Sequence, residues 1–196
     1  GLVSAFSFLV KDDGGTVNGG VDLDTSPDTI SVNITAVSDA PEGANRNPSI
    51  SVTTNEDISY TLKVADFGFT DPLDANPPSS VLPDQLAAVK ITTLPLASQG
   101  TLQLNGANVA AGDSVSVASI AGNKLVFVPF PNLNGSGAAS FTFQVQDSGS
   151  PANGGLVTDL TPRTMSVNLT AVNDAPIGTS KTVTVNQGAS FTITAS

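Results

Sequence analysis

The chain contains two copies of one long segment, and this internal repeat limits its fold more than any other feature. Residues 6–41 read FSFLVKDDGGTVNGGVDLDTSPDTISVNITAVSDAP, and residues 141–176 read FTFQVQDSGSPANGGLVTDLTPRTMSVNLTAVNDAP. The two align without a gap at an offset of 135 residues, from 6 to 141. A second, shorter pair of segments also matches: NEDISYTL at 55–62 resembles NQGASFTI at 186–193. Such self-similarity is typical of tandem-repeat proteins.

The repeat predicts three parts of the chain. Residues 42–176 form one complete unit, residues 1–41 are the C-terminal part of a preceding unit, and residues 177–196 are the N-terminal part of the next. The sequence therefore reads as a segment of a longer tandem array. Alternatively, the two partial units pair with each other, within one chain or between chains.

Alternation of apolar and polar residues indicates the secondary structure. Eight segments of the complete unit alternate in this way and are bounded by Gly, Pro, Asn or Asp, as β-strands are. No segment has a convincing helical period, although residues 83–88 could form one short turn. The expected fold is all-β, an antiparallel β-sandwich of the immunoglobulin type. The predicted strands are residues 50–54, 58–64, 86–94, 100–104, 114–120, 124–130, 140–147 and 164–172.

The composition argues against several classes of function. The 196 residues include no Cys and no His, so there is no thiolate or imidazole for catalysis or for binding zinc. The net charge is −10, without a basic cluster, which argues against nucleic acid as a partner. No apolar run approaches the roughly 18 residues of a membrane span. Because a Ser nucleophile would also lack its His, we expect no enzymatic activity.

The acidic residues are almost all Asp and gather in predicted loops. Of the 17 acidic residues only Glu42 and Glu56 are Glu. In an immunoglobulin-like sandwich the loops after strands 58–64 and 140–147 lie at the end where the chain enters. Carboxylates held together there repel one another, and a Ca²⁺ ion with six to eight oxygen ligands would relieve the repulsion. The first loop carries Asp66, Asp71, Asp74 and Asn76. The second loop carries Asp147, Asn153 and Asp159, and the entering segment carries Asp39.

A second group of oxygen ligands is expected at the opposite end, where the chain leaves the unit. The predicted metal ligands there are Glu56, Asn173 and Asp174, with Asp57, Asn132 and Asn134 nearby. The following unit has Gln187 and Gly188 in place of Glu56 and Asp57, so its junction should bind metal more weakly. Any single Asp in these loops could instead be a simple turn former.

Several motifs resemble the bacterial cadherin-like tandem repeats of large calcium-dependent surface adhesins. They are Phe127-x-Pro129, Asn134-Gly135, SFTFQVQDSGSP at 140–151 and VNLTAVNDAP at 167–176. The resemblance implies an extracellular, cell-surface sandwich without catalytic activity, stiffened by Ca²⁺ at repeat junctions and supporting adhesion and biofilm formation. The acidic motif that cadherins carry before the strand at 140–147 is absent, since Asn132 and Asn134 stand there.

Two functions follow as hypotheses. In the first, the chain is a structural extender whose partners are the neighbouring repeats. In the second, it is an adhesive module that contacts carbohydrate or a surface protein through an exposed patch. Phe67 and Phe69 would form this patch, unless they close the end of the core instead.

Overall fold

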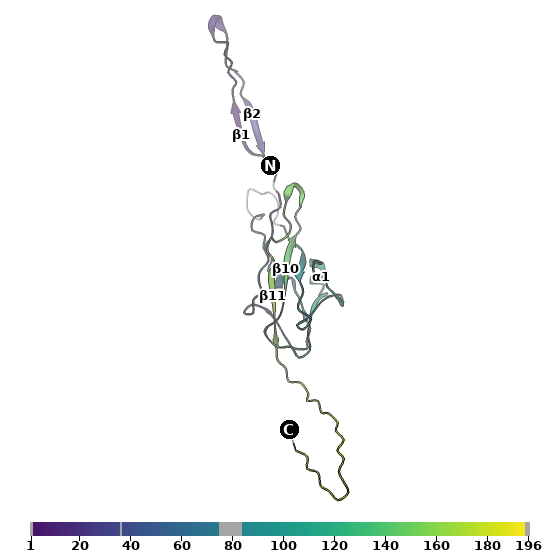
Figure 1. The fold of residues 1–196 in the computed structure, drawn as a ribbon. Coiled ribbons are helices and arrows are strands. Elements are labelled where there is room, and N and C mark those ends of the chain that lie inside the picture. The colour runs from purple at the N-terminus through teal and green to yellow at the C-terminus, as the bar shows by residue number, and fades with distance from the viewer. Residues whose placement is uncertain (1, 36, 75–83, 195–196) are drawn as a thin grey trace.

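The computed structural model describes residues 2–35, 37–74 and 84–194, and this part of the chain is predominantly β (Figure 1). Residues 2–35 form an N-terminal hairpin, residues 42–172 form a central module, and residues 173–194 form an extended C-terminal tail. Figure 1 shows the hairpin and the tail at opposite ends of the central module. Among the described residues, no helix has the length and hydropathy needed to cross a bilayer.

The central module consists of two sheets. One has five strands in the order β3-β11-β10-β5-β8, and the other has four strands in the order β4-β9-β6-β7. All neighbouring strands are antiparallel except β3, which runs parallel to β11 with Val52 beside Val167. The first sheet contains β3 (Val52–Asn55), β5 (Leu86–Thr93), β8 (Ser114–Ser116), β10 (Gly135–Asp147) and β11 (Arg163–Thr170). The second contains β4 (Tyr60–Thr61), β6 (Gly100–Leu104), β7 (Ala107–Asn108) and β9 (Leu125–Pro129).

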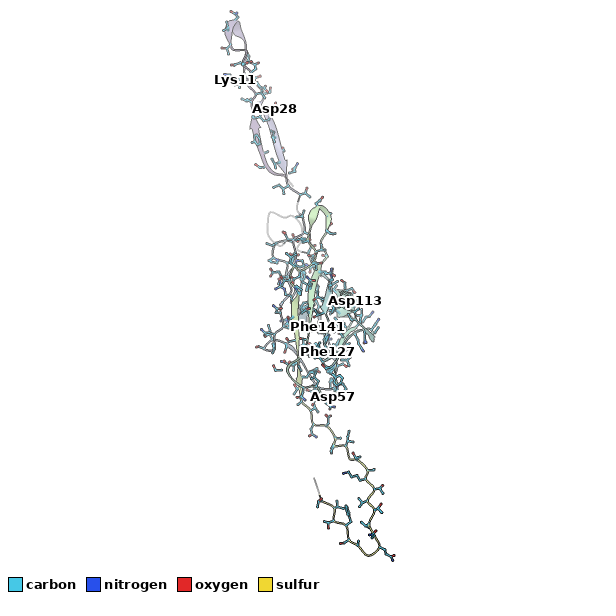
Figure 2. The ribbon with its side chains drawn as sticks, in the orientation of Figure 1. Lys11, Asp28, Asp57, Asp113, Phe127 and Phe141 are labelled. Atoms are coloured by element: carbon cyan, nitrogen blue, oxygen red, sulfur yellow. The ribbon has the colours of Figure 1, made fainter. Side chains whose placement is uncertain are left out.

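The two sheets share one hydrophobic core. Along β9 and β10 buried and less buried residues alternate, as expected for strands with one face inward. Phe127 of β9 and Phe141 of β10 are both fully buried and lie inside the module (Figure 2). Phe67 closes the core, and its ring and that of Phe143 form a T-shaped pair with a centroid distance of 4.9 Å and an interplanar angle of 85°. The alternation used to predict these strands therefore also predicts the core residues.

Two predicted strands are partly wrong. Residues 114–120 form only the short strand β8 before helix α1 (Val117–Ala121), because Ser116 caps the helix by accepting a hydrogen bond from the Ser119 N–H. Residues 58–64 form only β4, because the chain then turns into the 3₁₀ helix η2 (Val64–Phe67). In both cases local hydrogen bonds override the alternating pattern.

The N-terminal hairpin repeats the pairing of the central module. Its strands β1 (Leu2–Phe8) and β2 (Asp28–Asn33) pair Phe6 with Ile30, as β10 and β11 pair Phe141 with Met165. The 3₁₀ turns at the two tips, η1 (Val17–Gly19) and η3 (Ala152–Gly154), also correspond. Each contains an Asn with positive φ, 58° at Asn18 and 57° at Asn153. The aligned segments thus have the same register and the same turn.

Candidate metal centre

Four carboxylates meet where the chain enters the central module. Asp71 and Asp74 follow Thr70, whose backbone pairs with Glu42 of the entering chain. Asp84 precedes β5, and Asp147 ends β10 opposite Leu86 of β5, so the pairing of these strands brings Asp84 and Asp147 to one edge. We call Asp71, Asp74, Asp84 and Asp147 the acidic cluster. Carboxylate oxygens of Asp71, Asp74 and Asp84 lie within 4.8 Å of one another, so these three residues could hold a metal ion.

Two members of the acidic cluster are buried without full hydrogen bonding. Asp71 is only 8% exposed and Asp147 only 6%. Both carboxylate oxygens of Asp71 and the Oδ2 atom of Asp147 lack a hydrogen-bond partner among the described residues. An unpaired buried charge is strongly unfavourable, and native proteins usually neutralise it by pairing, protonation or metal binding.

The pKa values of both carboxyl groups respond to this environment. The pKa of Asp147 is raised to about 6, chiefly by burial. The hydrogen bond from the Gly149 N–H lowers this pKa in part, whereas the negative charges of the other carboxylates in the acidic cluster raise it further. Burial also raises the pKa of Asp71, and so does the charge of Asp74. The Asp74 backbone N–H lowers the pKa of Asp71 in part, although it does not approach in hydrogen-bond geometry.

The same carboxylates hold the entering chain in place. The Asp39 N–H donates to Asp74 Oδ2 at 3.0 Å, and the Ser38 hydroxyl donates to Asp84 Oδ2 at 3.1 Å. On its other side, the Ser38 carbonyl accepts from the Leu156 N–H at 2.8 Å. An ion bound by the acidic cluster would therefore act on residues that also fix the linker between hairpin and module.

The glycine at position 149, two residues after Asp147, is explained by its closeness to the acidic cluster. A Cβ atom at this position would lie 2.5 Å from Asp84 Oδ2 and 2.9 Å from Asp147 Oδ1, and would overlap the Ser38 hydroxyl. Only a residue without a side chain allows the backbone to approach the cluster so closely. The Asp-x-Gly spacing is thus a requirement of this site.

The structure brings together some of the residues predicted for the upstream metal site and not others. Asp71, Asp74 and Asp147 lie in the acidic cluster, while Asp39 joins it through its backbone N–H. Asp66 lies apart from the cluster, with its Oδ2 atom accepting from the Lys63 N–H at 2.7 Å. Asn76 is outside the described residues.

Asp159, also considered as an oxygen ligand, forms a buried ion pair instead. Its Oδ2 atom accepts from Arg163 Nε at 2.7 Å and from the Gly43 N–H at 2.8 Å. The guanidinium holds the pKa of Asp159 below its ordinary value despite burial, which alone would raise it. Asp159 thereby connects the entering chain to the end of the β10–β11 hairpin.

The residues predicted for the downstream site do not converge in the same way. Glu56 is buried, and both its carboxylate oxygens accept hydrogen bonds, from the Val172 N–H at 2.6 Å and from Asn134 Nδ2 at 2.9 Å. These bonds lower its pKa. Asn173 and Asp174 are exposed at the start of the tail. Glu56 therefore fastens the leaving chain to the module, at the end where Figure 2 labels Asp57.

Asp84 is a member of the acidic cluster that the sequence does not predict, because it lies in the possible short turn at residues 83–88. The available signal was its position directly before the strand at 86, because the start of that strand lies beside the end of the strand carrying Asp147. The hydroxyl of Ser148, which bonds Asp84 Oδ1 at 3.3 Å, was missed for the same reason.

No protein-family model, curated protein or solved structure matches the chain. The geometry of the acidic cluster and the sequence motifs are therefore the basis for assigning a function to the chain.

Proposed function

We propose that this chain is a structural extender segment of a bacterial cell-surface adhesin, in which Ca²⁺ bound by the acidic cluster stiffens the junction between successive cadherin-like repeats. The observation that carries the proposal is the pair of buried, incompletely bonded carboxylates of Asp71 and Asp147 beside the linker. Ca²⁺ accepts carboxylate oxygens in flexible geometry, which suits ligands from several loops.

The strand order supports an immunoglobulin-like sandwich. In that fold strands B, E and D form one sheet, and strands C, F and G form the other. The sheet β4-β9-β6 corresponds to B, E and D, and the neighbours β5, β10 and β11 correspond to C, F and G. The shared register of β1–β2 and β10–β11 supports tandem repetition of this unit.

A role in stiffening follows from the contacts of the linker. Ser38 and Asp39 are hydrogen-bonded to Asp84 and Asp74, so the linker and the cluster form one network. Without a cation, repulsion among the carboxylates opposes this arrangement. With one, the carboxylates are neutralised and the linker bonds are retained, which limits bending between the hairpin and the module.

The test is thermal unfolding of the full chain in Ca²⁺ and in chelator. An ion that binds only the folded state raises its stability, by about 2.7 kcal/mol when the free ion is at 100 times its dissociation constant. The variant Asp71→Asn should lose most of this gain, whereas Asp113→Asn, at an exposed turn, should keep it. Equal midpoints in Ca²⁺ and in chelator for the unaltered chain would refute the metal site.

The alternative, an adhesive module for carbohydrate or a surface protein, has less support. Phe67 is buried in the core and Phe69 packs against it, so they do not form the exposed patch that this hypothesis required. A small groove of about 190 Å³ lies between Leu94, Leu102 and Val109. Its size is below the range usual for ligand sites, and no charged side chain lines it.

A further inference from the structure

The first and last strands of the central module lie side by side and run in the same direction. β3 is the first strand after the chain enters, β11 is the last before it leaves, and their register places Val52 beside Val167 and Asn55 beside Thr170. In the described part of the chain, every other pair of neighbouring strands is antiparallel. The parallel pairing has a mechanical consequence, because these two strands connect the module to the rest of the chain.

The hydrogen-bonded contact with β11 is longer than β3 itself. Before β3, the Arg46 N–H donates to the Thr164 carbonyl at 2.7 Å, and the Arg46 carbonyl accepts from the Ser166 N–H at 2.8 Å. These two bonds make a parallel bridge. After β3, the Glu56 N–H donates to the Thr170 carbonyl at 2.9 Å. We call the contact of residues 46–56 with residues 164–172 the parallel contact, and it extends along nearly all of β11.

Side chains reinforce the parallel contact at two points. Pro48 lies in the turn between Arg46 and β3, and its carbonyl accepts from Asn168 Nδ2 of β11 at 2.9 Å. Where the chain leaves, Glu56 Oε1 accepts from the Val172 N–H at 2.6 Å, and such charge-assisted bonds are stronger than neutral ones. Glu56 is buried, so this bond is largely shielded from water. Side-chain bonds thus secure both the interruption of the contact and its last position.

The direction of pull decides how these bonds are loaded. Figure 1 shows the chain entering the module at one end and leaving from β11 at the opposite end. Tension between the two ends therefore pulls the entering segment and β11 in opposite directions along their length. Because the two strands are parallel, this tension shears the parallel contact, and its evenly spaced hydrogen bonds share the load. When both strands are pulled from the same end, the bonds open one after another.

We propose that the parallel contact is the force-bearing element of the module, which resists tension between the two ends of the chain in shear. The inference rests on the proposed extender function only for the direction of the load, since a segment of an extended adhesin is pulled from both ends. It does not depend on the acidic cluster, whose residues lie outside the parallel contact. Forced unfolding is governed by the rate of unfolding, so this arrangement protects the module kinetically without requiring a high equilibrium stability.

The experiment measures the force that unfolds single molecules of the full chain in two directions of pull. The chain contains no Cys, so introduced cysteines are unique attachment points. Glu42→Cys with Asn173→Cys loads the parallel contact in shear, whereas Ile58→Cys with Asn173→Cys pulls both strands from the exit end, and all these positions are exposed. Chelator in both measurements separates the result from the proposed Ca²⁺ site. The unfolding force should be at least about twofold lower for the second pair, because the bonds share the load only in the first. Equal forces would overturn the proposal.

Two substitutions test the parallel contact without changing the direction of pull. With the first pair of attachment points, Glu56→Ala removes the bond to the Val172 N–H and should lower the unfolding force. Asp113→Ala is the matched control and should leave the force unchanged, since Asp113 Oδ2 also accepts a backbone N–H, from Ala110 at 2.8 Å, but in an exposed turn outside the contact. An equal effect of the two substitutions would show that the load passes elsewhere. The comparison of directions alters no residue of the β3–β11 pairing, so it decides the proposal even when Glu56→Ala does not fold.

Discussion

Replacing Asp147 by Asn should stabilise the calcium-free protein at neutral pH. The raised pKa of about 6 means that the ionised carboxylate disfavours the folded state, since an ordinary Asp has a pKa of 3.8. That difference corresponds to about 3 kcal/mol at pH values well above 6. An Asn keeps the acceptor for the Gly149 N–H and removes the buried charge, so most of this free energy should be recovered.

The sign of the pH dependence provides an internal check. The folded state binds a proton at Asp147 more tightly than the unfolded state does, so this group makes the calcium-free protein more stable as the pH falls from 7.5 towards 5. The advantage of Asp147→Asn should therefore be largest at pH 7.5 and should shrink below pH 6. In Ca²⁺ the order should reverse, because the variant lacks one ligand.

Urea denaturation in chelator at pH 7.5 and pH 5 measures these differences, with Asp113→Asn as the control for removal of an exposed Asp charge. The control should change the free energy of unfolding by no more than about 0.5 kcal/mol. If Asp147→Asn proves neutral or destabilising in chelator at pH 7.5, the reasoning about the buried charge is refuted.

Three further substitutions test other parts of the account. Gly149→Ala should lower the melting temperature and weaken Ca²⁺ binding, because its Cβ collides with the acidic cluster, whereas Gly178→Ala, in open space, should do neither. Calorimetric titration measures the Ca²⁺ affinity of both variants, and equal affinities would contradict the steric argument. Arg163→Met should destabilise the module by on the order of 3 kcal/mol in urea by leaving Asp159 buried and unpaired, and a double-mutant cycle with Asp159→Asn should show coupling. Glu56→Gln should lower the melting temperature at pH 7, and because the pKa of Glu56 is lowered the gap should close only as the pH falls well below 4.5; a constant gap from pH 7 to 3 would show that its charge is unimportant.

The core was readable from the sequence because alternation along strands such as residues 124–130 and 140–147 carries direct information about which side chains face inward. The parallel pairing of β3 with β11 could not be read from the sequence, since alternation predicts a strand but not its partner. Helix α1 was missed because the short run from Val117 alternates, and only the cap at Ser116 distinguishes it from a strand.

The candidate site was predictable in part for a similar reason. An immunoglobulin-like topology, which we expected from the sequence, places Asp71, Asp74 and the end of the strand that carries Asp147 at one end of the module, so this expectation was enough to group them. Asp66 was expected at the same end, but the turn at η2 directs its carboxylate to the Lys63 N–H. Side-chain direction within a loop depends on local hydrogen bonds that residue types alone do not specify.

The most direct test of the account is to locate the cation by anomalous diffraction from crystals of the full chain grown in millimolar Ca²⁺. We expect one ion bonded to oxygens of Asp71 and Asp147 at about 2.3–2.6 Å, with further ligands from Asp74 and Asp84. Well-ordered crystals at pH 7.5 in which these carboxylates surround no anomalous peak would contradict the claim that the junction is held by metal.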